Sequence, residues 1–240
     1  MLLSLVIPAY NEEKRLAVTL EKISTYLDRK EIDYEVIIVD DGSVDKTSQV
    51  ALSSKLAKQN KLILLKNEEN KGKGYSVKRG ILKAKGEYIL FSDADLSTPI
   101  EELAKLFFYI NNYNIVIGSR AKKESKIIVH QPFYREIAGK IFNLFVQIFI
   151  LKGICDTQCG FKLFKTDCAK KIARYLKTSG FVFDVEMLYL AKKFGYNIKE
   201  VGIIWSNSCE SKVNILKDFS KIFKDLISIK YIHKNTLWKN

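Results

Sequence analysis

Cysteine and histidine are scarce in this 240-residue chain, and their spacing excludes the common structural zinc sites. The four cysteines form no CxxC pair, and only His130 and His233 could complete a metal site with them. We therefore expect reduced, mostly buried thiols in an intracellular protein. The N-terminal apolar run follows no basic leader and ends at Pro8, so we expect no secretory signal and a cytoplasmic location.

Two common nucleotide-binding signatures are missing as well. No GxGxxG follows the first apolar run, and GxxxxGK followed by Ser or Thr occurs nowhere, so neither a Rossmann dinucleotide site nor a P-loop is predicted. No apolar stretch reaches the ~20 residues that a membrane-spanning helix needs. The 47% of hydrophobic residues instead fits one globular domain with a sizeable core.

Positive charge is present in excess, and it is unevenly distributed. The formal net charge is +13. Residues 1–120 contain 18 Lys and Arg against 17 Asp and Glu, whereas residues 121–240 contain 22 against 10. A surplus confined to one half of the chain favours an anionic partner, such as a phosphate, a nucleic acid or an acidic membrane surface.

Short apolar runs alternate with amphipathic segments in the first half. We expect strands at residues 2–7, 36–39, 62–65, 88–91 and 115–118. We expect helices to begin at the capping residue Asn11, at Asp45 and at Pro99, and a further helix to follow residues 70–74. This alternation predicts an α/β fold with a single mostly parallel sheet flanked by helices, whose ligands bind at the carboxyl ends of the strands.

Polar clusters follow four of these strands, at residues 8–12, 40–41, 71–74 and 93–95. An acidic pair after a strand often caps a helix or closes a turn. Because four clusters would meet at one edge of the sheet, we expect a ligand-binding crevice there instead. Asp93 and Asp95 are hard carboxylates one residue apart, suited to Mg²⁺ or Mn²⁺ together with phosphate oxygens. Such a cation would stabilise a departing diphosphate.

The order of these motifs resembles that of a known enzyme family. The segments IPAYNE (7–12), VDDGS (39–43), NKGKG (70–74) and DAD (93–95) resemble the motifs of family 2 inverting glycosyltransferases, which have the GT-A fold. The resemblance continues through GSR (118–120) and Trp205 to SKV (211–213). DTQCGFK (156–162) and FDVE (183–186) resemble one branch, the dolichyl-phosphate β-glucosyltransferases and other polyprenyl-phosphate glycosyltransferases.

The resemblance implies a role for each matching residue. Those implied to bind the uracil and ribose of a nucleotide-diphosphate sugar are Pro8, Tyr10, Glu12, Asp40 and Asp41. Those implied to hold the metal and the diphosphate are Asp93 and Asp95, with Lys73 beside the diphosphate. The cations implied to contact donor or acceptor phosphates are Arg120, Arg135 and Lys212. As catalytic residues we expect Asp95, Arg120, Lys212 and Asp184.

Asp184 is expected at the start of a helix, where it could instead serve as the cap. It would act as a base for a hydroxyl acceptor, whereas a lipid phosphate is anionic near neutral pH and needs little help from a base.

Two positions depart from the family pattern. Ser97 stands where mannosyl-phosphate synthases usually carry glutamine, which argues against that branch, and Glu210 replaces the glycine that usually precedes the Ser-Lys pair.

Two apolar segments of the second half indicate contact with a membrane. Nine of the eleven residues 141–151 are apolar. This segment fits a buried core helix or an in-plane interfacial helix, and at about 17 Å it is too short to span a bilayer. Residues 213–240 predict a basic amphipathic helix with Lys217, Lys221 and Lys224 on its polar face, which suits either a covering helix or an anionic membrane surface.

We therefore expect a single GT-A domain with three parts. Residues 1–120 would bind the nucleotide sugar and the metal, residues 121–212 the acceptor, and residues 213–240 would form the basic helix. The expected reaction transfers a hexose, glucose from UDP-glucose, to a polyprenyl or dolichyl phosphate. The enzyme would be peripheral, on the inner face of the membrane.

Other functions are weaker alternatives. Within the same fold, the donor could be another sugar nucleotide such as GDP-mannose, and the acceptor a soluble molecule or a polysaccharide. A nucleotidyltransferase would need a glycine-rich first turn, and residues 8–11 (PAYN) contain no glycine. A nucleic-acid-binding protein is disfavoured, because the acidic strand-end clusters would repel a phosphate backbone. We expect no nucleic-acid partner.

Overall fold

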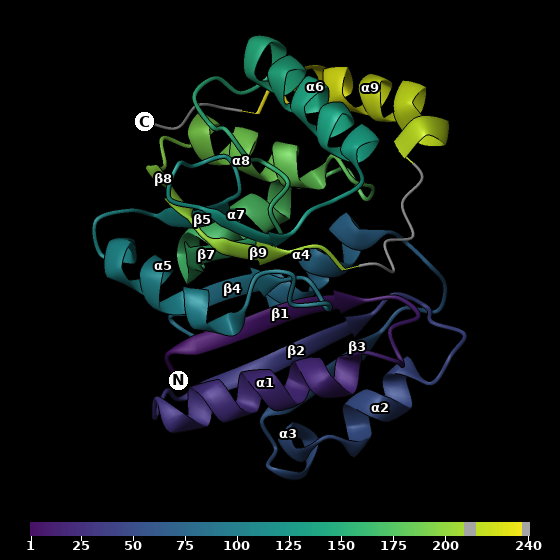
Figure 1. Cartoon of the computed structure of the whole chain (residues 1–240), viewed down its shortest axis with the longest axis vertical. Coiled ribbons are helices and arrows are strands. Elements are labelled where there is room, and N and C mark those ends of the chain that lie inside the picture. The colour runs from purple at the N-terminus through teal and green to yellow at the C-terminus, as the bar shows by residue number, and fades with distance from the viewer. Residues whose placement is uncertain (209–214, 237–240) are drawn as a thin grey trace.

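A seven-stranded sheet forms the centre of the molecule (Figure 1). The structure, a computed structural model, describes residues 1–208 and 215–236, and the side chains of residues 215–222 lie outside the described part. The strands, in sheet order, are β3 (Leu62–Lys66), β2 (Tyr34–Asp40), β1 (Leu3–Ala9), β4 (Tyr88–Ser92), β7 (Phe161–Lys165), β5 (Ile115–Ser119) and β8 (Ile198–Gly202). Neighbours are parallel except β7, which is antiparallel to β4 and β5.

This architecture confirms the predicted α/β fold with a mostly parallel sheet. All five strands expected in the first half are present, and their observed ends differ by two residues at most. β1 and β2 are buried along their whole length, which explains why their sequences are nearly continuous apolar runs. A small parallel sheet of β6 (Lys126–Val129) and β9 (Ile204–Ser206) was not expected.

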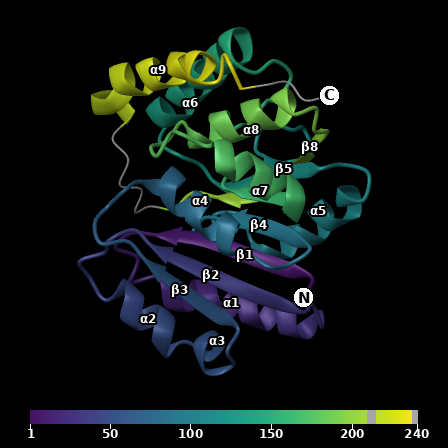
Figure 2. The same ribbon diagram turned by 180° about the vertical axis from the view of Figure 1, so that it is seen from behind.

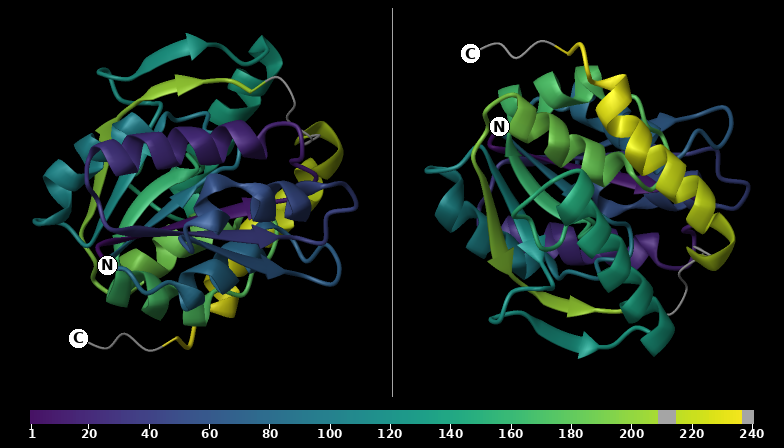
Figure 3. Two further views of the ribbon diagram at one scale, coloured as in Figure 1. Left: turned by 90° about the horizontal axis from the view of Figure 1, so that it is seen from below. Right: turned by 90° about the horizontal axis from the view of Figure 1, so that it is seen from above.

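Helices cover both faces of the sheet (Figure 3). The helices on one side are α1 (Leu16–Arg29), α2 (Thr47–Ser53), α3 (Lys55–Lys58) and α5 (Leu103–Ile110), the last preceded by the short 3-10 helix η1 (Ile100–Glu102). Those on the other side are α4 (Lys73–Lys83), α7 (Thr166–Tyr175) and α8 (Phe183–Lys193). Because alternate strand residues point to opposite faces, Ile38 packs in the core that contains Leu20, and Ile37 in the core that contains Val77.

Helix α1 begins later than its sequence indicates. Asn11, the expected cap, has a φ of 55°, in the left-handed region, and α1 starts at Leu16. The backbone N–H groups of Glu12 and Glu13 bind Thr47 Oγ1 (2.7 Å) and Asp45 Oδ2 (3.1 Å) instead of a cap. The prediction of an Asn11 cap is therefore wrong, because side chains of the connection after β2 satisfy these donors.

The helix expected from Asp45 to Lys58 is also interrupted. The backbone at Ser54 is extended, with ψ of 158°, and divides the segment into α2 and α3. The Ser54 hydroxyl accepts a hydrogen bond from the N–H of Ala57, so this serine caps α3.

Helices α6 (Phe133–Phe149) and α9 (Ile215–Ile232) lie together at the end of the molecule remote from α1, α2 and α3 (Figures 1 and 2). The rings of Phe145 and Phe223 pack against each other between them. Only Phe142 and Val146 of α6 are fully buried, so the interpretation of residues 141–151 as a core helix is wrong. Among the described residues, no helix is long and apolar enough to cross a bilayer.

Candidate active site

A cavity of about 470 Å³ opens beside the carboxyl ends of β1 and β4. The chain extends the sheet from β1 to β2 and β3 and then returns to place β4 on the other side of β1, and ligands of open α/β sheets bind at such a switch point. The structure brings together residues of all four sequence clusters, namely Pro8, Tyr10, Glu12, Asp41, Gly72, Lys73, Asp93 and Asp95. Arg15, Gly180 and Phe181 also line the cavity, and the sequence did not single them out.

The two aspartates after β2 lie in different environments. Asp41 lines the cavity, and its carboxylate accepts hydrogen bonds from the N–H groups of Lys71 (3.0 Å) and Gly72 (2.9 Å). Asp40 is fully buried and accepts hydrogen bonds from the Ser43 N–H (2.8 Å) and the Ser48 hydroxyl. Asp40 thus closes the connection after β2 and does not line this cavity, where the prediction would place it.

The carboxylates of Asp93 and Asp95 both face the cavity, and their surroundings fit a hard divalent cation. Asp93 Oδ1 is buried and lies beside Lys73 Nζ, so a metal ion at this oxygen would share it with that amine or displace it. Burial, followed by the neighbouring charge of Asp93, raises the pKa of Asp95 above its ordinary value, and a cation would relieve both effects. No third Asp, Glu, His or Cys completes a metal cluster within the described residues, so phosphate oxygens and water would supply the remaining ligands.

The Asp93 turn is held from two directions. Its backbone N–H donates to the carbonyl of Gly160 (3.1 Å), and a Cβ at Gly160 would collide with the Asp93 carboxylate, so any larger residue there would displace that carboxylate. On the cavity side, Lys73 Nζ lies 2.6 Å from Asp93 Oδ1. Burial alone would lower the pKa of Lys73, but Asp93 and Asp184 more than offset it, so the amine stays charged. Lys73 therefore presents a positive charge where a diphosphate would bind.

Asp184, the expected base, does not line the cavity. Its carboxylate is almost fully buried and pairs with the buried Lys162 amine at 2.5 Å. Burial raises the pKa of Asp184, and the charges of Lys162 and Lys73 oppose that shift. The alternative role as a helix cap is wrong as well, because Val182 is the cap residue of α8. Asp184 and Lys162 thus form a buried ion pair beneath the site.

A second cavity, of about 260 Å³, lies between α6, β6 and the loop that precedes β7. Arg120 and Arg135 both line it, as the phosphate-binding prediction requires. The Arg120 guanidinium forms two hydrogen bonds with Asp156, of 2.7 and 2.8 Å, and lies over the ring of Trp205. Burial alone would raise the pKa of Asp156, but Arg120 holds it below its ordinary value. Lys212, the third predicted cation, lies outside the described residues.

Nothing in the sequence indicated that a buried carboxylate, that of Glu186, supports the wall of the first cavity. Glu186 accepts hydrogen bonds from the N–H groups of Lys177 and Thr178, both 2.8 Å, and pairs with His233 at 2.6 Å. The loop it holds continues to Gly180 and Phe181 in the cavity wall. The sequence places Glu186 inside a recognisable motif, but its partner His233 is 47 residues away, so local spacing gave no signal of the pair.

Comparison with known proteins identifies the family. The family model for glycosyl transferase family 2 matches residues 4–173. The chain is 38% identical to a dolichyl-phosphate beta-glucosyltransferase of Dictyostelium discoideum, over 99% of this chain and 76% of that one. It is 35% identical to a protein of the same name from Homo sapiens, over 99% and 77%.

Solved structures share the fold at much lower identity. Mannosyl-3-phosphoglycerate synthase from Rubrobacter xylanophilus superimposes with a TM-score of 0.72 at 16% identity, covering 100% of this chain and 76% of that chain. Glucosyl-3-phosphoglycerate synthase from Mycobacterium tuberculosis, solved with Mn²⁺ and uridine diphosphate, has a TM-score of 0.69 at 17% identity, covering 95% and 78%. The chain belongs to glycosyl transferase family 2, and over nearly its whole length it is similar to dolichyl-phosphate beta-glucosyltransferases.

Proposed function

We propose that this glycosyltransferase transfers glucose from UDP-glucose, with inversion, to a polyprenyl or dolichyl phosphate at the cytoplasmic surface of a membrane. The observation that supports this acceptor most directly is the outward face of α6. Its exposed apolar residues, spaced at helical intervals, are Phe133, Ile137, Ile141, Leu144 and Ile148. Ile227 and Tyr231 of the neighbouring helix α9 are exposed apolar side chains as well.

The side of α6 that faces the protein is mixed. Arg135, Lys140 and Asn143 line the second cavity, while Phe142 and Val146 pack in the core. On the outside, Ile141 and Leu144 are more than half exposed. An ordinary surface helix is apolar inward and polar outward, so this outer row of apolar side chains is unusual. A helix that places cations over a cavity and apolar side chains outward suits a phosphate headgroup whose hydrocarbon chain lies in a bilayer.

The two cavities would serve donor and acceptor. We assign the uridine and the diphosphate to the cavity lined by Tyr10, Asp41 and Lys73, and the acceptor phosphate to the cavity lined by Arg120 and Arg135. The loop of residues 156–160 joins them, since Asp156 lines the second cavity and Gly160 contacts Asp93 of the first. This adjacency would bring an acceptor oxygen towards the sugar of the donor.

The reaction is then a single displacement. An oxygen of the acceptor phosphate forms a bond to the anomeric carbon while the bond from that carbon to the diphosphate oxygen breaks, and the diphosphate leaves with the electron pair. Because a phosphate monoester is anionic near neutral pH, no base is needed, which agrees with the burial of Asp184 in an ion pair. Asp93 and Asp95 would hold Mg²⁺ or Mn²⁺, which supplies charge stabilisation to the departing diphosphate.

The proposal is tested by supplying donor and acceptor classes in parallel. The full chain is incubated with Mn²⁺, anionic vesicles containing polyprenyl phosphate, and labelled UDP-glucose or GDP-mannose, and the lipid is then extracted. We expect label in the lipid fraction with UDP-glucose, and none from vesicles that lack the polyprenyl phosphate. Transfer to 3-phosphoglycerate, with none to lipid, would contradict the acceptor, and a preference for GDP-mannose would contradict the donor.

A further inference from the structure

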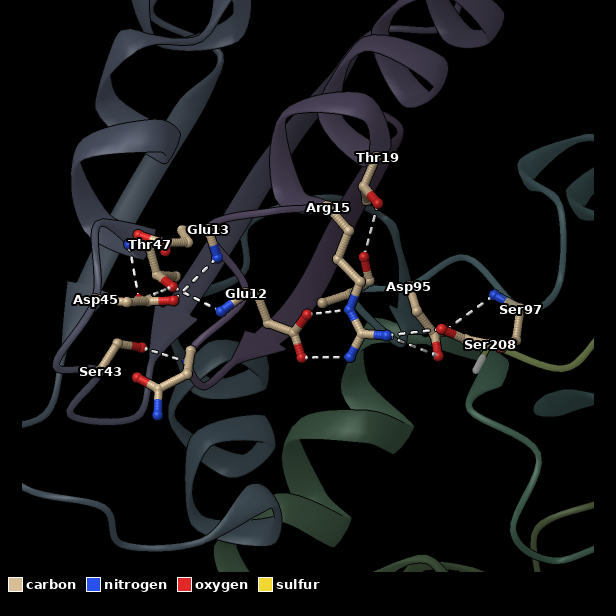
Figure 4. A network of polar contacts seen from close by, with 12 residues as sticks. Glu12, Glu13, Arg15, Thr19, Ser43, Asp45, Thr47, Asp95, Ser97 and Ser208 are labelled. Carbon is tan, nitrogen blue, oxygen red and sulfur yellow. Dashed lines mark hydrogen bonds and ion pairs between the residues drawn. The ribbon is translucent and has the colours of Figure 1, made fainter. Parts of the chain in front are cut away.

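Arg15 contacts Glu12 and Asp95 of the donor cavity and also Ser208, far away in the sequence (Figure 4). Its guanidinium pairs with the Glu12 carboxylate through two nitrogens, one of them at 2.7 Å. Another nitrogen donates to Ser208 Oγ at 2.7 Å and lies 3.9 Å from Asp95 Oδ2. The side chain is 23% exposed and lines the cavity, so its charge faces the space where metal and diphosphate would bind.

The start of α1 also holds the backbone of the Asp93–Asp95 turn. Thr19, four residues after Arg15 and therefore on the same side of the helix, donates a hydrogen bond to the Ala94 carbonyl at 2.6 Å. Arg15 approaches the side chain of the next residue, Asp95. This double contact fixes the distance between the Arg15 charge and the Asp95 carboxylate, so Arg15 is not simply a mobile surface cation.

Each carboxylate of the proposed metal site is thus accompanied by a cation of the chain. Lys73 lies beside Asp93, and Arg15 lies beside Asp95. A divalent cation entering the cavity alone would meet the Lys73 ammonium and the Arg15 guanidinium, the second partly balanced by Glu12, and both would weaken its binding. A nucleoside diphosphate would add negative charge between them and remove that penalty. Metal and nucleotide should therefore bind more tightly together than either binds alone.

We propose that Arg15 is a positioning residue that makes cation binding at Asp93 and Asp95 conditional on the nucleotide diphosphate. In the absence of nucleotide, Arg15 occupies the neighbourhood of Asp95 and disfavours a bare metal ion. With the diphosphate present, the same guanidinium is balanced by phosphate charge and the cation is held firmly. The inference rests on the proposed metal site and assigns to Arg15 a part in the order in which its ligands bind.

Calorimetric titration with Mn²⁺, alone and with saturating UDP, tests this role without measuring turnover. In the parent we expect weak Mn²⁺ binding that UDP strengthens. In Arg15→Gln, Mn²⁺ affinity without UDP should rise about tenfold, because the repulsion of one charge on a dication at short range has been removed. The Mn²⁺ affinity measured with UDP should change much less. UDP should therefore strengthen Mn²⁺ binding less in this variant than in the parent. Arg15→Lys keeps the charge, so UDP should strengthen its Mn²⁺ binding nearly as much as it does in the parent.

Arg29→Gln is the matched control, since it removes a cation from the far end of α1, about 20 Å along the helix, where screening suppresses its influence. Its Mn²⁺ affinity, with and without UDP, should match that of the parent. A purely structural role for Arg15 predicts the opposite sign, with Mn²⁺ binding weaker in Arg15→Gln both with and without UDP. That result, or unchanged Mn²⁺ affinity, overturns the inference while leaving the metal site intact. If the parent binds no Mn²⁺ even with UDP, the metal site and the inference both fail.

Discussion

Residues 1–120 and residues 121–240 place their charged and apolar side chains differently. In the first region the charges almost cancel, with 18 Lys and Arg against 17 Asp and Glu, and the cations of the cavity each lie beside a carboxylate. In the second region cations exceed anions by 22 to 10, and α6 exposes a row of apolar side chains. Both regions contribute buried side chains to the same sheet, so neither is a loosely packed appendage.

The difference indicates two kinds of ligand. Internally compensated charge around a cavity suits a small, highly charged molecule that enters and leaves, because the unliganded site is then not destabilised by repulsion. A net excess of cations in a region that also exposes apolar side chains suits a surface that is itself anionic and apolar, such as a bilayer. The four predictions below test this contrast, from the largest expected effect to the smallest.

The largest effect is expected where the two regions join. β7, from the second region, lies between β4 and β5 of the first, and its Lys162 pairs with Asp184 in the interior. Lys162→Met leaves the Asp184 charge buried without this partner, and we expect the free energy of unfolding to fall by about 3–5 kcal/mol. Denaturant unfolding measures this.

The double variant Lys162→Met, Asp184→Leu is the control for that prediction. It removes both charges, so much of the lost stability should return. If Lys162→Met alone is as stable as the parent, or if the double variant is no better than the single one, the pair does not stabilise the packing of α8 on β7.

The next largest effect concerns the compensated charge of the first region. Asp95→Asn keeps the size of the side chain but removes one charge facing the cation, and turnover should fall about a hundredfold. Initial rates at saturating Mn²⁺ measure it, with circular dichroism to show that the variant is folded. Near-normal turnover would remove Asp95 from the metal site.

A smaller effect should follow from loss of apolar contact in the second region. Leu144→Ser with Ile148→Ser removes two exposed side chains from α6, and binding to anionic vesicles should weaken at least tenfold, as expected from apolar area buried in the bilayer. Phe108→Ser, which removes a still more exposed apolar side chain from α5 in the first region, is the control and should bind like the parent. Vesicle sedimentation compares them, and equal binding of all three would mean that the apolar face of α6 does not contact lipid.

The smallest effect is a pH dependence that arises from Glu186. Burial alone would raise the pKa of Glu186. Hydrogen bonds from His233, Thr178 and Lys177 lower it by more, so its folded pKa lies below the ordinary value of 4.5. A depressed carboxyl pKa stabilises the fold above the unfolded pKa, and that stability is lost as the pH falls through the folded pKa. The unfolding free energy should therefore decline below about pH 4.5.

Glu186→Gln should flatten this decline and should cost about 1 kcal/mol at neutral pH, roughly the value of one hydrogen bond. Urea unfolding at a series of pH values compares the variant with the parent. An unchanged slope between pH 3 and pH 5, a window set around the ordinary carboxyl pKa, would show that Glu186 contributes nothing to the acid sensitivity.

The outline of the fold and much of the cavity could be read from local patterns. β1, β2 and β4 are nearly continuous apolar runs because parallel strands are buried on both faces, and the polar residues after them meet at one edge in any such sheet. The start of α1 was misread, because Asn11 and the two glutamates after it are an ordinary capping pattern and nothing nearby shows that Thr47 and Asp45 bind their N–H groups.

By itself the sequence determined the mostly parallel sheet, the clustering of Tyr10, Asp41, Lys73 and the carboxylates of Asp93 and Asp95, and the basic surplus of the second half, because each depends on residue type and short-range periodicity. Only the tertiary structure decided which residues far apart in the sequence come into contact. It left a row of apolar side chains of α6 exposed, paired Asp184 with Lys162 instead of exposing it as a base, and placed Arg15 beside Asp95. These outcomes depend on which surfaces remain uncovered after the core has packed, and on contacts across 22 and 80 positions of the chain, which no local pattern contains.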